Sequence, residues 1–335
     1  MKRDVNIELY RCLLTLGIVI LHVIGLYGKE WHWLSSAFVW CVPWFVFITG
    51  WFGGRFSFRK VATLYGIALY CFLVSNGVGI LLGNDANHMV GFLKNVGDVF
   101  ASGKLVGWLK VSWFIFLDHW FIHAYIHAYI GMIMLAPIVD VAITSGDKSL
   151  MDVIKLFCPF LVFVFVWSFL TNYNCTKAFI APAPTSQMLT LLGVYVVARI
   201  LRIFDLSRYF NVWRAWILFV ICIILATFKI GGFNSAIAIG ITIGSFILIQ
   251  RVHIPQRLSS FILLISPCMF SVFLLHANPW IYRLMHQSVD VIADFGVPKV
   301  LAFLGVALIT FTVGLIADMP RRIAVCAIRS KRGSR

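Results

Sequence analysis

The stretch Asn6–His22, NIELYRCLLTLGIVILH, decides the class of fold. It is apolar over most of the length of a membrane-spanning helix, yet it contains Glu8, Arg11 and His22. Eleven residues at ~100° each amount to roughly three helical turns, so Arg11 and His22 project from one face, ~16 Å apart along the axis. Because an ionisable residue inside a membrane helix is costly, this face is a functional-site hypothesis by default.

The composition extends the membrane interpretation to the whole chain. Of the 335 residues, 61% are hydrophobic and 12% are charged, whereas about 25% of the residues of a soluble domain are charged. The stretch 160–170, FLVFVFVWSFL, lacks the alternation of a membrane β-barrel strand. The sequence therefore predicts an all-α polytopic membrane protein, whose partner is the lipid bilayer.

Ten apolar runs are long enough, or nearly so, to span a bilayer. We expect helices at residues 7–27, 35–53, 61–82, 116–143, 153–171, 186–200, 213–228, 234–250, 260–277 and 300–318.

The net charge of +15 fits cytoplasmic loops better than nucleic-acid binding. With the N-terminus inside, 19 basic residues fall on the cytoplasmic side and 8 on the other. This bias predicts that both termini are cytoplasmic. We expect one integral membrane domain over residues 1–335, with a basic cytoplasmic tail at 320–335 and no nucleic-acid partner.

Two interpretations of the first helix remain open. Glu8 precedes Arg11 by three residues, so the two side chains are neighbours on a helix and are expected to pair. In one interpretation this pair anchors the helix at the interface and His22 is a hydrogen-bonded core residue. In the other, Arg11 and His22 face the interior of the helix bundle and carry out chemistry.

Four landmarks in order make the chain similar to the acyltransferase-3 family of membrane O-acyltransferases. Arg11 and His22 are separated by ten residues, as in that family, and Glu8 fills its acidic position. VPWFVFITGWF contains Thr49-Gly50 where the family tends to have Ser-Gly. HAYIGMIMLAPIVD and FSVFLLHANPW resemble two later family helices, and the second places His276 in the site.

This resemblance implies acyl transfer from acyl-CoA, usually acetyl-CoA, to a hydroxyl of a cell-surface glycan or lipid-linked saccharide. It implies no resident cofactor and a bacterial inner-membrane location. His22 is the expected base or acyl carrier, with Glu8 beside Arg11. Arg11 would bind CoA phosphates or stabilise negative charge. Arg59 and Lys60 are candidates for the same phosphates, although positive-inside charge also explains them.

Histidines recur every four residues in DHWFIHAYIHAYI, which contains Asp118, His119, His123 and His127. The stripe drifts ~40° per step, so one helix alone would not direct all three imidazoles at one ion, and we predict no metal. A polar face lining a cavity and a packed helix with hydrogen-bonded histidines both remain open. Asp118, His119, His123 and His276 are secondary site candidates.

A different function class fits the same intramembrane groups. A proton-coupled secondary transporter or exporter of a small solute or lipid-linked sugar would use them as a proton relay. Such transporters often contain two related halves, which this sequence does not show convincingly. Near the end of the ninth expected helix, Trp280 would suit either sugar stacking or an interfacial aromatic belt.

Overall fold

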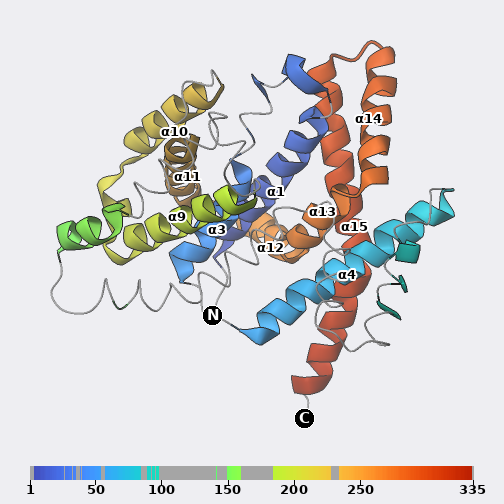
Figure 1. Cartoon of the computed structure of the whole chain (residues 1–335), viewed down its shortest axis with the longest axis horizontal. Coiled ribbons are helices and arrows are strands. Elements are labelled where there is room, and N and C mark those ends of the chain that lie inside the picture. Colours follow the sequence, from blue (N-terminus) through green and yellow to red (C-terminus); the bar gives the residue numbers. More distant parts are fainter. Residues whose placement is uncertain are drawn as a thin grey trace. The chain divides into compact units, whose positions relative to one another are not determined.

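A computed structural model of the chain provides the structure (Figure 1). It describes residues 4–25, 27–31, 33–34, 38, 40–53, 57–83, 89–91, 93–94, 96–97, 141, 149–159, 184–227 and 234–333. Every regular element of these residues is a helix. The predicted spans 116–143 and most of 153–171 lie outside the described residues.

Four helical segments are long and apolar enough to cross a membrane: Val5–Gly25, Phe58–Leu81, Gln256–His276 and Lys299–Ala327. Three shorter apolar segments are Pro43–Phe52, Val212–Thr227 and Ile239–Gln250. These segments support a helical membrane protein, whereas the count of ten spans and the cytoplasmic termini stay predictions.

The chain divides into two compact units that alternate along the sequence, and α1 (Val5–Gly25) contributes to both. The first unit contains Met1–Leu14, Lys29–Ser57 and Phe121–Ser259. The second contains Thr15–Gly28, Phe58–Trp120 and Ser260–Arg335. The short 3-10 helix η1 (Gly28–Trp31) spans the sequence boundary between the segments Thr15–Gly28 and Lys29–Ser57.

In the first unit, α3 (Cys41–Phe52) packs on α9 (Pro184–Ile203), and α10 (Val212–Thr227) packs on α11 (Asn234–Gln250). The 3-10 helix η2 (Leu206–Tyr209) follows α9. A Cβ atom on Gly50 would lie 2.6 Å from the carbonyl oxygen of Tyr195, so α3 and α9 approach each other through a residue without a side chain.

In the second unit, α4 (Phe58–Leu81), α13 (Met269–His276), α14 (Pro279–Asp294) and α15 (Lys299–Gly333) pack together. α12 (Gln256–Ile265) continues into α13 through the 3-10 turn η3 (Ser266–Cys268). This turn contains Pro267, which lacks the amide proton that a continuous α-helix needs. The ninth predicted helix is therefore interrupted.

The ten predicted spans leave out residues 278–299, where the structure contains α14. This helix forms a hairpin with α15 (Figure 1), and Met285 and Val289 are buried on one of its faces. At the other end of the hairpin, α15 continues as a helix through most of the predicted tail, to Gly333.

Candidate active site

The first turns of α1 hold the predicted pair of Glu8 and Arg11. Asp4 accepts hydrogen bonds from the amides of Asn6 and Ile7, at 3.0 and 3.4 Å, and so caps the start of the helix. Arg11 Nη1 lies 3.2 Å from Glu8 Oε1 and 3.4 Å from Oε2. The Glu8 side chain is 7% exposed and that of Arg11 is 39% exposed. The predicted pairing is confirmed, while the catalytic role of both residues stays a prediction.

The start of α1 is fixed by contacts within the first unit. Tyr10 shares a hydrogen bond of 2.7 Å with Ser245 and stacks on Trp44, with ring centroids 5.6 Å apart. The Asn6 amide group donates to backbone carbonyls at the end of α11 and just beyond it, those of Ile249, Gln250 and Val252. These contacts hold the helix that presents Arg11.

His22 meets His276 in the second unit. His22 Nδ1 lies 2.7 Å from His276 Nε2, and the two rings stack with centroids 4.8 Å apart. His276 is 1% exposed, whereas His22 is half-buried. The two residues are 254 positions apart in the sequence, so helix packing brings together a leading and a secondary candidate.

The hydrogen bonds assign the protons of this pair. His276 Nδ1 lies 3.0 Å from the carbonyl oxygen of Val272. Because a carbonyl oxygen accepts hydrogen bonds, His276 Nδ1 carries the proton and its neutral ring presents a lone pair at Nε2. His22 Nδ1 then donates to that lone pair, and the basic nitrogen of His22 is Nε2.

The corner between α13 and α14 holds His276 in place. Asn278 donates from its amide nitrogen to Ser75 Oγ at 3.1 Å and accepts from the Trp280 amide at 3.2 Å. The Trp280 indole donates to the carbonyl oxygen of Ser75 at 2.8 Å, and its ring lies where a Cβ atom on Gly79 would be. These contacts give Trp280 a structural role at the end of α13.

An aromatic residue of α14 adjoins His22. The Tyr282 ring lies 5.5 Å from the His22 ring, centroid to centroid, at an angle of 46°. Tyr282 belongs to α14, which lies outside the ten predicted spans.

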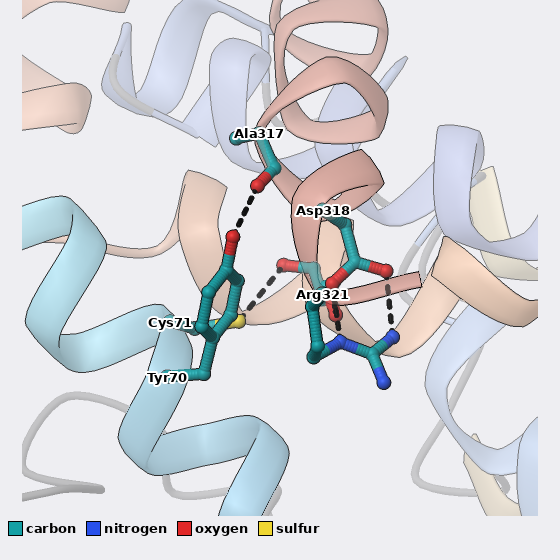
Figure 2. A network of polar contacts seen from close by, with 6 residues as sticks. Tyr70, Cys71, Ala317, Asp318 and Arg321 are labelled. Carbon is teal, nitrogen blue, oxygen red and sulfur yellow. Dashed lines mark hydrogen bonds and ion pairs between the residues drawn. The ribbon is translucent and has the colours of Figure 1, made fainter. Parts of the chain in front are cut away.

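A buried ionic network on α15 also escaped prediction. Arg321 Nε and Nη2 each donate to a different oxygen of Asp318, both at 2.6 Å, and Ser271 Oγ donates to Asp318 Oδ1 at 2.7 Å. Tyr70 donates to the carbonyl oxygen of Ala317 at 2.7 Å (Figure 2). These contacts connect α4 and α13 to α15. The α13 contact is made by Ser271, five residues before His276. The sequence signal that could have predicted this pair is an acid and an arginine three positions apart at the end of an apolar run, Asp318 and Arg321.

The remaining candidates are not part of this arrangement. Arg59 and Lys60 are exposed in the first turn of α4. Asp118, His119, His123 and His127 lie outside the described residues. Within the described ranges, no group of three or more histidine, cysteine, aspartate or glutamate side chains could hold a metal ion.

The comparisons with known proteins identify one family. A model of the acyltransferase-3 family, described as an acyltransferase domain, matches residues 4–319, nearly the whole chain. No curated protein and no solved structure matches it.

Proposed function

The chain belongs to the acyltransferase-3 family, and on that premise we propose that it moves an acyl group from acyl-CoA to a hydroxyl group. Membership of the family supports a membrane acyltransferase. The identities of the acyl donor and the acceptor are our proposal. We further propose acetyl-CoA as the donor and a cell-surface glycan or lipid-linked saccharide as the acceptor, at a bacterial plasma membrane.

The observation that supports this proposal is the hydrogen-bonded pair of His22 and His276. An alcohol attacks a thioester efficiently when a base removes its proton during the attack. The carbonyl of Val272 and the His276 ring orient His22 so that Nε2 is basic. Positive charge that develops on His22 strengthens its hydrogen bond to His276, since the donor then becomes charged.

The reaction follows from this arrangement. The hydroxyl oxygen attacks the thioester carbonyl while its proton passes to His22 Nε2. A C–O bond forms, the C–S bond breaks, and the departing sulfur takes a proton from the His22 imidazolium. A transient acyl-histidine at the same nitrogen is the alternative route, and a burst of thiol release before steady state would identify it.

The cationic candidates are proposed to bind the anionic donor. The Arg11 side chain is 39% exposed, and its planar guanidinium is suited to phosphate oxygens. Arg59 and Lys60 would meet the CoA phosphates on the predicted cytoplasmic side.

The test measures CoA thiol release and acyl-ester formation by detergent-purified protein with acetyl-CoA and candidate glycans. His22→Ala is expected to lower the rate by about 10²–10⁴-fold, the usual contribution of a general base. His253→Ala, which changes an exposed histidine, is the matched control. Glycan uptake into vesicles without thiol release would instead favour the transporter.

A second pair of variants tests the orienting role of His276. His276→Ala removes the acceptor of the His22 hydrogen bond, so we expect about a tenfold to hundredfold loss. His276→Gln retains an acceptor oxygen and is expected to recover part of that loss. If both variants release thiol at the wild-type rate, His276 does not orient His22.

A further inference from the structure

We propose that Tyr27, His286 and Asp290 form a binding subsite for a neutral polyhydroxylated ligand. The inference rests on the proposed function, because it assigns the subsite to the acceptor that presents its hydroxyl to His22. We call these three residues the Tyr27 cluster; all of them belong to the second unit.

The cluster is held together by hydrogen bonds and ring stacking. The Tyr27 hydroxyl lies 2.8 Å from Asp290 Oδ1 and 3.0 Å from the carbonyl oxygen of His286. His286 Nδ1 lies 3.0 Å from Asp290 Oδ2. The Tyr27 and His286 rings are nearly parallel, at 4° with centroids 4.8 Å apart. Both carboxylate oxygens and both rings therefore have fixed positions.

The polar groups of the cluster are accessible to a ligand. The side chains of His286 and Asp290 are 45% and 46% exposed. Each carboxylate oxygen has more than one acceptor position, so Asp290 retains capacity for further donors beside its contacts to Tyr27 and His286. Exposed ion pairs contribute little to stability, so stabilisation of α14 is a weak explanation for this arrangement.

The charges around the cluster favour a neutral ligand that donates hydrogen bonds. Asp290 disfavours anions. The Lys299 ammonium lies 5.5 Å from the centroid of the Tyr27 ring. It occupies the position that a cationic ligand would take over this ring, and its charge repels such a ligand. Burial and the adjacent Asp290 raise the pKa of the Tyr27 hydroxyl above its usual value, so Tyr27 remains a donor to the carboxylate. Neighbouring hydroxyls of a sugar or polyol match the acceptors that remain.

The position of the cluster connects it to the imidazole pair. Tyr282, whose ring contacts that of His22, precedes His286 by four residues on α14. Four residues correspond to ~6 Å along a helix, and they place both side chains on one side of it. A ligand of sugar size seated at the cluster would extend toward His22.

Saturation-transfer NMR on the detergent-solubilised full chain tests this subsite. The probes are methyl α-D-glucopyranoside and methyl β-D-galactopyranoside, with choline as the cationic comparison. We expect saturation of at least one glycoside and none of choline. Asp290→Asn and Tyr27→Phe are each expected to weaken glycoside binding about tenfold, the scale of one hydrogen bond to a charged group. Asp294→Asn, an exposed carboxylate one turn farther along α14, is the control and should bind as wild type does.

Other outcomes overturn the proposal. Absence of transfer to both glycosides in wild type, preference for choline, or unchanged glycoside binding in Tyr27→Phe and in Asp290→Asn would each do so. Tyr27→Phe provides the answer if Asp290→Asn does not fold, and Asp290→Asn does so in the reverse case.

The thiol-release assay separates this inference from the proposed function. If thiol release depends on His22 while glycoside binding is unchanged by substitutions in the Tyr27 cluster, only the subsite proposal is contradicted. If glycoside binding depends on the Tyr27 cluster but no thiol is released, the acyltransferase proposal is contradicted and the subsite proposal stands.

Discussion

Two acid–arginine pairs with the same three-residue spacing lie on apolar helices of this chain, Glu8–Arg11 on α1 and Asp318–Arg321 on α15. In the first, Arg11 Nη1 faces both carboxylate oxygens at 3.2 and 3.4 Å. In the second, two guanidinium nitrogens each meet a different oxygen at 2.6 Å. The spacing is therefore equal, and the geometry is not.

Burial separates the pairs further. Both acids are buried, with side chains 7% exposed in Glu8 and 0% in Asp318. The Arg11 side chain is 39% exposed, whereas that of Arg321 is 17% exposed. A buried, bidentate pair that also receives a serine hydroxyl is a fixed part of the helix packing. The longer Glu8–Arg11 contact involves a more exposed guanidinium, as our proposal that Arg11 binds the anionic donor requires. The same sequence signal thus marks a structural pair in one place and a candidate binding residue in the other.

The largest effect is expected from Asp318→Asn. This change leaves Arg321 partly buried without its counter-charge, and breaking a buried pair costs about 3–5 kcal/mol. Thermal unfolding of the detergent-solubilised protein measures the loss, with Asp294→Asn as the exposed control on α14. A loss below about 1 kcal/mol would contradict the contrast between the two pairs.

Arg11→Lys should show the opposite profile. Lysine keeps the charge and loses the planar fork that binds phosphate, so we expect kcat/KM with acetyl-CoA to fall about 30-fold, which is about 2 kcal/mol. The unfolding midpoint should stay close to that of wild type. Full activity together with a lower midpoint would make Arg11 a helix anchor.

The sequence predicted the fold where the apolar runs are continuous. Helices cover most of the described residues of the predicted spans, because a long apolar run has few other solutions in a membrane. The main exceptions are α3, which begins at Cys41 rather than near residue 35, and the 3-10 turn η3 inside the ninth span. α14 was missed because its apolar residues recur with a helical period between polar ones, as at Met285 and Val289. A search for unbroken runs does not detect such a pattern.

The sequence predicts which residues are candidates for the site, but it does not predict which of them contact each other. An ionisable group inside an apolar run identifies Glu8, Arg11 and His22 without any structure. The partnership of His22 with His276 depends on how two distant helices pack, which no local pattern encodes. Asp318 could have been found in the same way as Glu8, but it is the last residue of the predicted helix 300–318 and was not singled out.

Ser271→Ala sharpens the contrast from the side of the buried pair. Ser271 is fully buried and donates 2.7 Å to Asp318 Oδ1. Its loss leaves the ion pair intact and removes one hydrogen bond to a charged acceptor, so we expect a cost of about 1.5 kcal/mol. Thermal unfolding of Ser271→Ala, Asp318→Asn and the double variant measures whether the two residues act together. Additive losses would show that the serine does not support the pair.

The smallest effect is expected from Glu8→Gln, which makes the same carboxylate-to-amide change as Asp318→Asn. The Glu8 contact to Arg11 is longer, and the exposed guanidinium regains hydration when its partner becomes neutral. Although the Glu8 side chain is only 7% exposed, the loss should therefore stay close to that of an exposed ion pair, below about 1 kcal/mol. Thermal unfolding measures this value beside that of Asp318→Asn. Equal losses in the two variants would show that exposure of the arginine does not distinguish the pairs, and Arg11 would then be as structural as Arg321.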